Sequence, residues 1–274
     1  MLLAIDVGNS EVCFGIFDLN NKDQIMMPIE RGRFSTSDFR YDINRNKMLK
    51  VSLDNQLSQL NKVTNILISC VAPLILSDLK NFCDKILKCP TLVMGETGVS
   101  YPSQALVDSP GEVGADLRVS GFAAHTFYQG PLIVIGFGTA TTFSVINDQG
   151  DFCGTVIAPG VGIVSQALPR MATHLPQIAF KKPVSPLGLN TTCAMESGLF
   201  WGYIGLVEGI LLQLQQQNYL NIRQDSDKIK SLKIITTGGY AHLVAPHCAG
   251  ITEIDSDLTL KGLALIFKTT LKGT

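Results

Sequence analysis

The chain contains an internal repeat at an offset of 130 residues, and this repeat limits its fold more than any other feature. Residues 2–18 (LLAIDVGNSEVCFGIFD) and 132–148 (LIVIGFGTATTFSVIND) each contain an apolar strand, a turn of small residues and a second strand. Such a pair indicates two related domains, each with a polar turn that can hold part of a polyphosphate. The copies differ in one chemically important way, because the first has Asp6 where the second has Gly136.

Outside the repeat, the apolar pattern alternates between strands and helices. Further strands are predicted at an edge within residues 20–46 and at 65–71, 91–94, 152–158 and 232–236. Helices are predicted at 49–60, at 74–87, after Pro159-Gly160 and at 191–216. This alternation predicts a mixed α/β fold. No low-complexity linker interrupts it, and we predict two domains, 1–128 and 129–274.

Two further helices have specific start signals. Ser109-Pro110-Gly111-Glu112 combines an N-cap serine, a proline at the first helical position and a glutamate three residues after the cap. This combination predicts a helix that runs to about Phe127. Asp257 is the predicted N-cap of a final helix at 258–271.

Composition favours small-molecule chemistry over nucleic acid or membrane partners. The formal net charge is −1 and no dense basic run is present. The apolar segment 199–214 contains Glu208 and several glycines, which predicts a buried helix rather than a membrane span. The seven cysteines include no CxxC pair, so we expect reduced thiols and no zinc site. The N-terminus has no export signal, so we expect a cytoplasmic protein.

The first turn has the residues of a phosphate site. Gly8 permits close approach of the backbone to an anion, and Asn9 and Ser10 supply short donors to phosphate oxygens. Asp6, at the end of the strand, fits a carboxylate that holds a hydrated Mg²⁺ beside the phosphates. The alternative is a plain hairpin turn that needs Gly and Asn for positive φ.

Two later turns are candidates for further nucleotide contacts. Gly138, Thr139, Thr141 and Thr142 form a possible second phosphate clamp, although a threonine-rich strand would have the same composition. Gly238-Gly239 follows a strand and precedes a helical segment, which suits contact with a nucleotide. A turn that merely closes the fold would explain this pair equally well.

Asp116 is the candidate catalytic base. We predict that it lies about two turns inside the helix that begins near Ser109, among apolar residues and close to Gly111 and Gly114. There it could take the proton of an alcohol that attacks a phosphoryl group. A solvated surface carboxylate on a helix is the alternative.

Seven motifs occur in an order that resembles one enzyme family. They are DVGNS (6–10), GEVGAD (111–116), GTATT (138–142), GTVIAPGVG (154–162), NTTCAMESG (190–198), TTGG (236–239) and DLTLKGL (257–263). Together they are similar to the type III pantothenate kinases, of the superfamily of acetate and sugar kinases and actin. The resemblance spans nearly the whole chain.

The resemblance implies a fold and an activity. The fold is α/β, with two duplicated actin-like (ribonuclease H-like) domains, mixed central sheets flanked by helices, and an active site in the cleft between them. The activity is ATP-dependent phosphorylation of pantothenate to 4'-phosphopantothenate, the first step of coenzyme A biosynthesis. Mg²⁺ and a monovalent cation, K⁺ or NH₄⁺, are the implied cofactors. A homodimer with shared active sites is the implied assembly.

The resemblance also implies roles for individual residues. Asp116 would be the general base, and Asp6 would lie near Mg²⁺ and the phosphates. The other ATP-binding positions would be Gly8, Asn9, Ser10, Gly138, Thr139, Thr141, Thr142, Gly238 and Gly239. The pantothenate-binding positions would be Val107, Gly114, Ala115, and Thr191 or Thr192, the last two reaching the site of the partner subunit.

Three positions depart from the family pattern. Gly136 replaces an acidic residue linked to cation and phosphate binding, and Val107 replaces a tyrosine. Leu117 separates Asp116 from Arg118, whereas in the family the arginine follows the aspartate directly. Two functional classes therefore stay open. The first is an active kinase whose cation site is rebuilt from Asp148, Asp151 or water, and the second is a nucleotide-binding regulatory homologue with little kinase activity. A kinase for another alcohol is a third reading.

Overall fold

A computed structural model describes residues 1–20, 27–39, 53–172, 174–216 and 232–270, which form two compact units. Unit 1 comprises Met1–Phe127 with Asp257–Thr274, and unit 2 comprises Tyr128–Ser256. The expected division was 1–128 and 129–274. The structure differs from it in one respect, because the final helix belongs to unit 1 rather than to unit 2.

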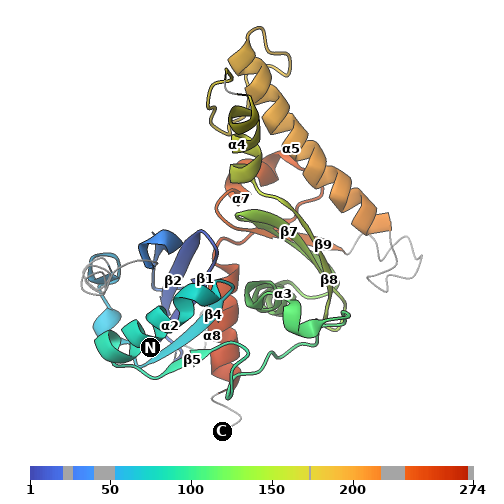
Figure 1. Ribbon diagram of the computed structural model, residues 1–274. Helices are drawn as coiled ribbons and strands as arrows, with labels where there is room; N and C mark the ends of the chain where they lie inside the picture. Colours follow the sequence, from blue (N-terminus) through green and yellow to red (C-terminus); the bar gives the residue numbers. More distant parts are fainter. Residues whose placement is uncertain (21–26, 40–52, 173, 217–231, 271–274) are drawn as a thin grey trace. The chain divides into compact units, whose positions relative to one another are not determined.

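Each unit is built on a mixed sheet of the same topology (Figure 1). In the described part of unit 1, the sheet order is β3-β2-β1-β4-β5, and in that of unit 2 it is β8-β7-β6-β9-β10. The first strand of each sheet pairs antiparallel with the second and parallel with a later strand. The strands are β1 (Leu2–Val7), β2 (Glu11–Phe17), β3 (Glu30–Ser35), β4 (Asn65–Cys70), β5 (Thr91–Val93), β6 (Leu132–Phe137), β7 (Ala140–Ile146), β8 (Phe152–Pro159), β9 (Lys233–Thr237) and β10 (Glu253–Ile254).

The sequence repeat corresponds to the two hairpins, with one correction. β1 and β6 share the same pattern of burial, and Asp6 and Gly136 occupy equivalent half-buried positions in it. The pairing Leu2 with Phe17 corresponds to Leu132 with Ile146, so the second hairpin is one residue shorter. The turn of the second copy therefore contains only Gly138 and Thr139, where the first has residues 8–10.

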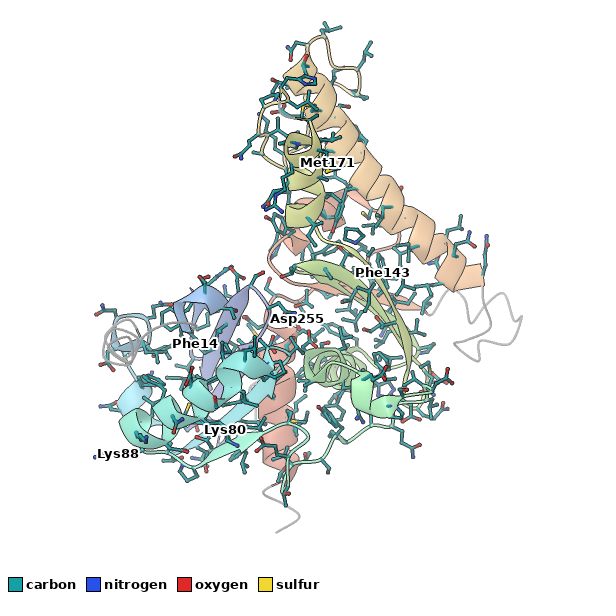
Figure 2. The ribbon with its side chains drawn as sticks, viewed as in Figure 1. Phe14, Lys80, Lys88, Phe143, Met171 and Asp255 are labelled. Carbon is teal, nitrogen blue, oxygen red and sulfur yellow. The ribbon has the colours of Figure 1, made fainter. Side chains whose placement is uncertain are left out.

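In unit 1, helices cover both faces of the sheet. Helix α2 (Pro73–Phe82), followed by a π turn (Cys83–Leu87), packs on the face that contains Phe14 (Figure 2). Helices α3 (Ala115–Tyr128) and α8 (Leu258–Thr270) pack on the opposite face, with Leu2, Ala4 and Leu67. The final helix joins this unit because its buried residues, such as Leu263, pack with these residues of β1 and β4.

In unit 2, helices α4 (Val161–Met171), α5 (Thr191–Gln216) and α7 (Ala241–Val244) accompany the sheet. The core around Phe143 takes side chains from α5, including Phe200, Tyr203 and Val207 (Figure 2). Among the described helices, α5 alone is long and apolar enough to cross a membrane, with a window of mean hydropathy 1.3. One face of α5 contributes these side chains to the core, but 33% of its apolar window is buried, so the predicted buried helix is found only in part.

Short helical turns complete the described elements, and one of them corrects a prediction. They are the 3₁₀ turns Thr36–Phe39, Leu60–Lys62, Pro110–Glu112 and Ala245–His247. Ser109 precedes the turn Pro110–Glu112, and its side chain makes no capping hydrogen bond. Val113 is then extended, with φ −71° and ψ 123°, so the chain leaves the helical conformation before α3 begins at Ala115. The predicted helix at 49–60 falls partly on residues 40–52, which lie outside the described residues; its described part is α-helical at 53–56 only.

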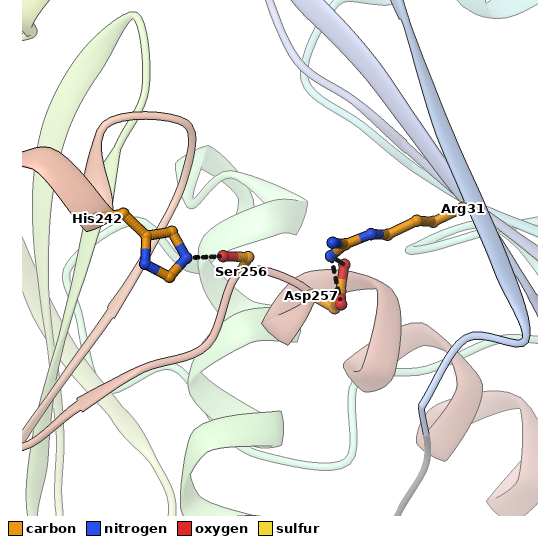
Figure 3. Close-up of polar contacts among 4 residues, drawn as sticks. All are labelled: Arg31, His242, Ser256 and Asp257. Atoms are coloured by element: carbon orange, nitrogen blue, oxygen red, sulfur yellow. Dashed lines mark hydrogen bonds and ion pairs between the residues drawn. The ribbon is translucent and has the colours of Figure 1, made fainter.

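The chain passes from unit 2 to unit 1 between two neighbouring residues that are each bonded within their own unit (Figure 3). The Ser256 hydroxyl lies 3.0 Å from His242 Nε2, in unit 2. The Asp257 carboxylate accepts bonds of 3.0 and 2.9 Å from Arg31 Nη1, in unit 1. The Asp257 carbonyl also accepts the amide hydrogen of Lys261 at 2.9 Å, so α8 begins where the sequence predicted.

Candidate active site

Asp6 lies at the end of β1, on the sheet face that packs against α3 and α8. Alternate residues of a strand share a face, and Leu2 and Ala4 fix which face this is. Its partner in the parallel pair with β4 is Ser69, whose side chain is buried. Asp6 Oδ1 and Ser69 Oγ are both buried without a hydrogen bond of good geometry. A buried carboxylate oxygen without a hydrogen bond calls for an explanation, and a bound ion is one that fits a carboxylate.

Asp116 is the second residue of α3, so it lies in the first turn of the helix and not two turns inside it. Its Oδ1 accepts the backbone N–H of Leu117 at 2.9 Å. Gly114 lies against both this carboxylate and unit 1's β4 end, because a Cβ added there would be 2.6 Å from Asp116 Oδ1 and 3.4 Å from Val71 Cγ1. The absence of a side chain at Gly114 therefore allows Asp116 to adopt this position.

The two carboxylates lie close enough to raise the pKa of Asp6. Burial is the larger cause and the charge of Asp116 the second, and together they raise the pKa of Asp6 to about 7, against a smaller opposing effect of the Ser69 hydroxyl. Burial also raises the pKa of Asp116, although the backbone N–H groups of Leu117 and Asp116 itself oppose the rise. Two partly desolvated carboxylates that repel each other favour a shared proton or a bound cation.

The residues present fit Mg²⁺ held mainly by its substrate. Among the described residues, no group of three or more His, Cys, Asp or Glu side chains could hold a metal ion. Mg²⁺ usually takes one or two carboxylates and completes its shell with water and phosphate oxygens. Asp6, with its unpartnered Oδ1 and its neighbour Asp116, supplies a carboxylate set of this size.

The first turn is fixed by Thr36, which no site prediction included. The Gly8 amide donates to the Glu11 carbonyl at 2.9 Å, which closes the hairpin. The buried Thr36 donates its hydroxyl to the Gly8 carbonyl at 2.8 Å, and its amide donates to the Ser10 carbonyl at 2.9 Å. The side chains of Asn9 and Ser10 are exposed beyond this clamp, as a phosphate-binding turn requires.

In unit 2, three glycine-containing segments meet at the end of β6. The Gly160 amide donates to the Thr139 carbonyl at 3.2 Å, and the Tyr240 amide donates to the Phe137 carbonyl at 3.4 Å. A Cβ at Gly160 would lie 2.4 Å from the Gly138 carbonyl oxygen, and one at Gly238, where φ is +95°, would lie 2.5 Å from that of Phe137. The predicted turns at Gly138 and at Gly238-Gly239 are therefore neighbours. Gly160, which no site prediction included, joins them.

The two threonines of β7 point to opposite faces of the sheet. Thr141 is fully buried and its hydroxyl bonds to the Pro159 carbonyl at 3.3 Å and to the Tyr203 hydroxyl, so this side chain is directed into the core. Thr142 is half-buried on the other face, where its Oγ1 would lie 2.7 Å from a Cβ at Gly136. Thr142 and the exposed Thr139 thus have their side chains outside the α5 core, whereas Thr141 does not.

The proposed substitutes for the carboxylate missing at Gly136 lie at the wrong end of the hairpin. Leu132 pairs with Ile146, so Asp148 and Asp151 follow the end of β7 that is next to the start of β6. Gly136 is four residues further along β6, which corresponds to about 13 Å at about 3.3 Å per residue. Asp148 and Asp151 therefore do not rebuild a cation site beside Gly136.

The remaining predicted residues lie on two other segments. Ala115 is buried at the start of α3, and Val107 is half-buried in the segment before it. Thr191 and Thr192 are exposed in the first turn of α5, where the Asn190 side chain accepts the Cys193 amide hydrogen at 2.9 Å as a helix cap. This helix start is further fixed by an ion pair of 2.9 Å between Lys181 and Glu196.

The sequence profile described as Type III pantothenate kinase matches residues 2–213. The chain belongs to this family. A Type III pantothenate kinase from Paramagnetospirillum magneticum is 38% identical over 271 residues, covering 98% of this chain and 97% of that protein. One from Rhodospirillum rubrum is 36% identical over 276 residues, with 98% of each chain covered. One from Syntrophobacter fumaroxidans is 35% identical with both chains covered in full.

Solved structures of low sequence identity share the fold of this family member. The activator of 2-hydroxyisocaproyl-CoA dehydratase from Clostridium difficile, solved with bound ADPNP, has a TM-score of 0.53 at 10% identity and covers 99% of this chain and 96% of its own. The ethanolamine utilization protein EutJ from Carboxydothermus hydrogenoformans has a TM-score of 0.51 at 14% identity, with coverages of 96% and 89%. These likenesses show the fold alone, which is a two-domain α/β fold.

Proposed function

We propose that this protein transfers the γ-phosphoryl group of ATP to pantothenate and forms 4'-phosphopantothenate, the first step of coenzyme A biosynthesis. The observation that carries the proposal is the pair of half-buried carboxylates in unit 1. Asp6 ends a central strand with an unpartnered oxygen, and Asp116 begins the helix that packs on the same face. Both belong to the motifs that this chain shares with the family.

Asp116 is the proposed general base. The primary hydroxyl of pantothenate would give its proton to an Asp116 carboxylate oxygen while its own oxygen attacks the γ-phosphorus, and ADP would leave. Burial raises the pKa of Asp116 toward neutral pH. A general base is most effective when its pKa is close to the pH at which the enzyme works. Its bond from the Leu117 amide fixes Oδ1 in the first turn of α3. Gly114 and Ala115 would line the pantothenate site beside it.

Asp6 is the proposed Mg²⁺ ligand. When bound there, Mg²⁺ supplies positive charge that neutralises the phosphate oxygens during transfer. The exposed Asn9 and Ser10 would donate to ATP phosphates from a turn that Thr36 fixes. In unit 2, Gly138 and Thr139, together with Gly238 and Gly239, would provide further contacts to the nucleotide through a backbone that Gly160 supports.

The family's monovalent cation, K⁺ or NH₄⁺, has less support from the residues of this chain. Position 136 has no carboxylate, and Asp148 and Asp151 lie at the other end of the hairpin. We therefore expect the activity to depend only weakly on K⁺ or NH₄⁺. Phosphate transfer would then rely on Mg²⁺ and backbone donors for its charge stabilisation.

A homodimer is part of the proposal, and unit 2 has a surface that suits one. Helix α4 and the start of α5 lie side by side at a distance from the sheet (Figure 1), and the end of α4 and the chain that follows it expose apolar side chains. Met171 (Figure 2) and Leu189 are 88% and 91% exposed, and Val184 and Leu187 are also exposed. Exposed apolar groups of this kind favour a protein interface. A partner on this surface would bring Thr191 or Thr192 to its own pantothenate site.

The cellular setting follows from the same proposal. Coenzyme A synthesis from pantothenate and ATP would place the protein in the cytoplasm. The formal net charge of −1 favours small-molecule substrates over nucleic acid or an anionic membrane as partners.

One observation favours a second function. Gly136, Leu117 and Val107 each remove a polar group at a position where the family has one. Losing one charge-assisted hydrogen bond costs about 1.5 to 3 kcal/mol, or one to two powers of ten in affinity. A homologue with these changes could keep nucleotide binding as a regulatory protein while losing the transfer step.

A single assay separates these functions. Purified protein is incubated with ATP, Mg²⁺, K⁺ and pantothenate, and phosphopantothenate is measured beside an Asp116→Asn variant. Product well above that of the variant supports the kinase. Product at the level of the variant, with ATP still bound, supports the regulatory homologue. Thermal shifts with a panel of alcohols test the remaining reading, because stabilisation by another alcohol and not by pantothenate would indicate a different acceptor.

A further inference from the structure

A tyrosine and an arginine form a stacked pair at the start of α3. The guanidinium carbon of Arg118, two residues after Asp116 in α3, lies 3.7 Å from the centre of the Tyr101 ring. Arg118 Nη2 also donates to the Ser103 carbonyl at 2.7 Å. The stack and this bond hold the segment around Tyr101 against the first turns of α3. A cation over an aromatic face is worth most when it is partly removed from water, as here.

The positive charge of Arg118 contacts the Tyr101 ring rather than a carboxylate. Among the described residues, the structure shows no ion pair for Arg118, and its Nε is buried without a hydrogen-bond acceptor. Burial lowers the pKa of Arg118, and the interaction with Tyr101 opposes the fall. Arg118 is therefore a support for the Tyr101 ring and not a counter-ion for Asp116.

The phenol of Tyr101 lies within the electrostatic field of Asp116. Burial raises the pKa of Tyr101 above its ordinary value of 10.0, Arg118 opposes the rise and Asp116 adds to it. The phenol therefore keeps its proton and acts as a donor at neutral pH. Its hydroxyl lies over Gly95, where an added Cβ would be 3.5 Å away. Among the described residues, the structure shows no hydrogen bond that would occupy this donor.

We propose that Tyr101 binds the acceptor alcohol and that Arg118 positions Tyr101 for this task. The inference rests on the proposed function and assigns one more contact at the same site. The Tyr101 hydroxyl would donate to an oxygen at the hydroxyl-bearing end of pantothenate, the end whose primary hydroxyl Asp116 deprotonates. Tyr101 is then a substrate-binding residue, and Arg118 acts through it.

The test compares steady-state kinetics of wild-type protein with Tyr101→Phe, Arg118→Gln, Arg118→Lys and the double variant Tyr101→Phe/Arg118→Gln. Loss of one neutral hydrogen bond predicts a KM for pantothenate about 3- to 10-fold higher in Tyr101→Phe. The kcat and the KM for ATP should change less than about 2-fold, because the bond is uniform in the ground and transition states. Arg118→Gln should raise the KM for pantothenate similarly, and Arg118→Lys should raise it less because lysine keeps the cation.

The double variant distinguishes positioning from a general structural role. If Arg118 acts through Tyr101, Arg118→Gln adds no further rise in KM once the hydroxyl is gone, whereas independent effects would multiply. Tyr128→Phe is the matched control, since its hydroxyl donates to Asp255 Oδ2 at 3.0 Å in unit 2 and should leave the KM for pantothenate unchanged. Melting curves of each variant show whether it is folded.

The outcomes separate this inference from the proposed function. An active wild-type enzyme whose Tyr101→Phe variant has the wild-type KM for pantothenate overturns the role of Tyr101 and leaves the kinase intact. Multiplying effects in the double variant, or a parallel rise in the KM for ATP, overturn the positioning role of Arg118. A wild-type protein that makes no phosphopantothenate overturns the proposed function and this inference together.

Discussion

Asp6→Asn should make the ligand-free protein more stable while it removes activity. Folding raises the pKa of Asp6 from 3.8 to about 7, chiefly through burial. The folded state therefore binds this proton more tightly than the unfolded state does, and the free energy of unfolding falls as the pH rises from about 4 to 7. A rise of this size corresponds to about 4 kcal/mol of lost stability at a pH well above 7. Asparagine has no charge to bury, so the variant avoids this loss.

The expected gain is about 2 to 4 kcal/mol at pH 8, because an asparagine without a partner retains part of the cost of burying a polar group. The gain should shrink to about 1 kcal/mol near pH 4.5, where the wild-type carboxyl is largely protonated in the folded state. Hydrogen exchange measured by mass spectrometry on peptides from β1 and β4 is the appropriate assay. Trp201, the sole tryptophan, lies in unit 2 and would not report on unit 1.

Two comparisons make this prediction refutable. Asp78→Asn changes an exposed carboxylate in α2 and should leave the protection of β1 unchanged at both pH values. Adding Mg²⁺ and ATP should protect β1 more in the wild type than in Asp6→Asn, because the cation restores the charge balance at Asp6. Equal or lower protection in Asp6→Asn at pH 8 would refute the electrostatic account, as would a difference that does not vary with pH.

Three further predictions concern unit 2. Gly160→Ala should raise the KM for ATP at least several-fold, because its Cβ would lie 2.3 Å from the Thr139 carbonyl oxygen. Gly162→Ala is the control: the space around Gly162 is open, so this variant should leave the KM for ATP unchanged. Leu189→Glu, at a side chain 91% exposed, should convert a dimer to monomers in sedimentation experiments and reduce activity with it; a wild type that sediments as a monomer would contradict the proposed dimer. Gly136→Asp should make the initial rate more dependent on the K⁺ concentration, provided that the Thr142 side chain rotates away from the new carboxylate. An unchanged response to K⁺ would argue against a cation site at this position.

The sequence predicted the features that depend on local pattern and on the repeat. Short apolar runs indicated most of the strands of both sheets, and the repeat indicated two related domains, whose sheets share one topology. The position of Asp6 at a strand end followed from the same pattern. These features are predictable because they depend on the order of apolar and polar residues within a short stretch of sequence. The placement of an active site between the two domains stays a prediction.

Features set by long-range packing were not predictable in this way. The final helix has an apolar face that would suit either sheet, and only its packing against β1 and β4 assigns it to unit 1. The start of α3 was misplaced because Pro110 and Gly111 also suit a 3₁₀ turn, which ends at the extended Val113. The clamp of Thr36 on Gly8 joins residues 28 positions apart, and no local pattern marks it.

The same reason explains the corrections within the candidate site. The hydroxyl of Thr141 turns into the core because β7 pairs with β6 through a turn one residue shorter than the first, which a gapless comparison of the repeats concealed. The stack of Arg118 on Tyr101 depends on how a loop returns to α3. Sequence motifs therefore indicated the carboxylates and glycines of the site, and the structure was needed to find the side chains that support them.

The central claim is that Asp116 deprotonates pantothenate for attack on ATP. Its most direct test is the initial rate of 4'-phosphopantothenate formation, followed by mass spectrometry, for wild-type protein and Asp116→Asn at saturating ATP and Mg²⁺. The account predicts product from the wild type and a kcat about 10²- to 10⁴-fold lower in the variant, with a melting temperature close to that of the wild type. Equal rates for the two proteins, or no product from either, would contradict it.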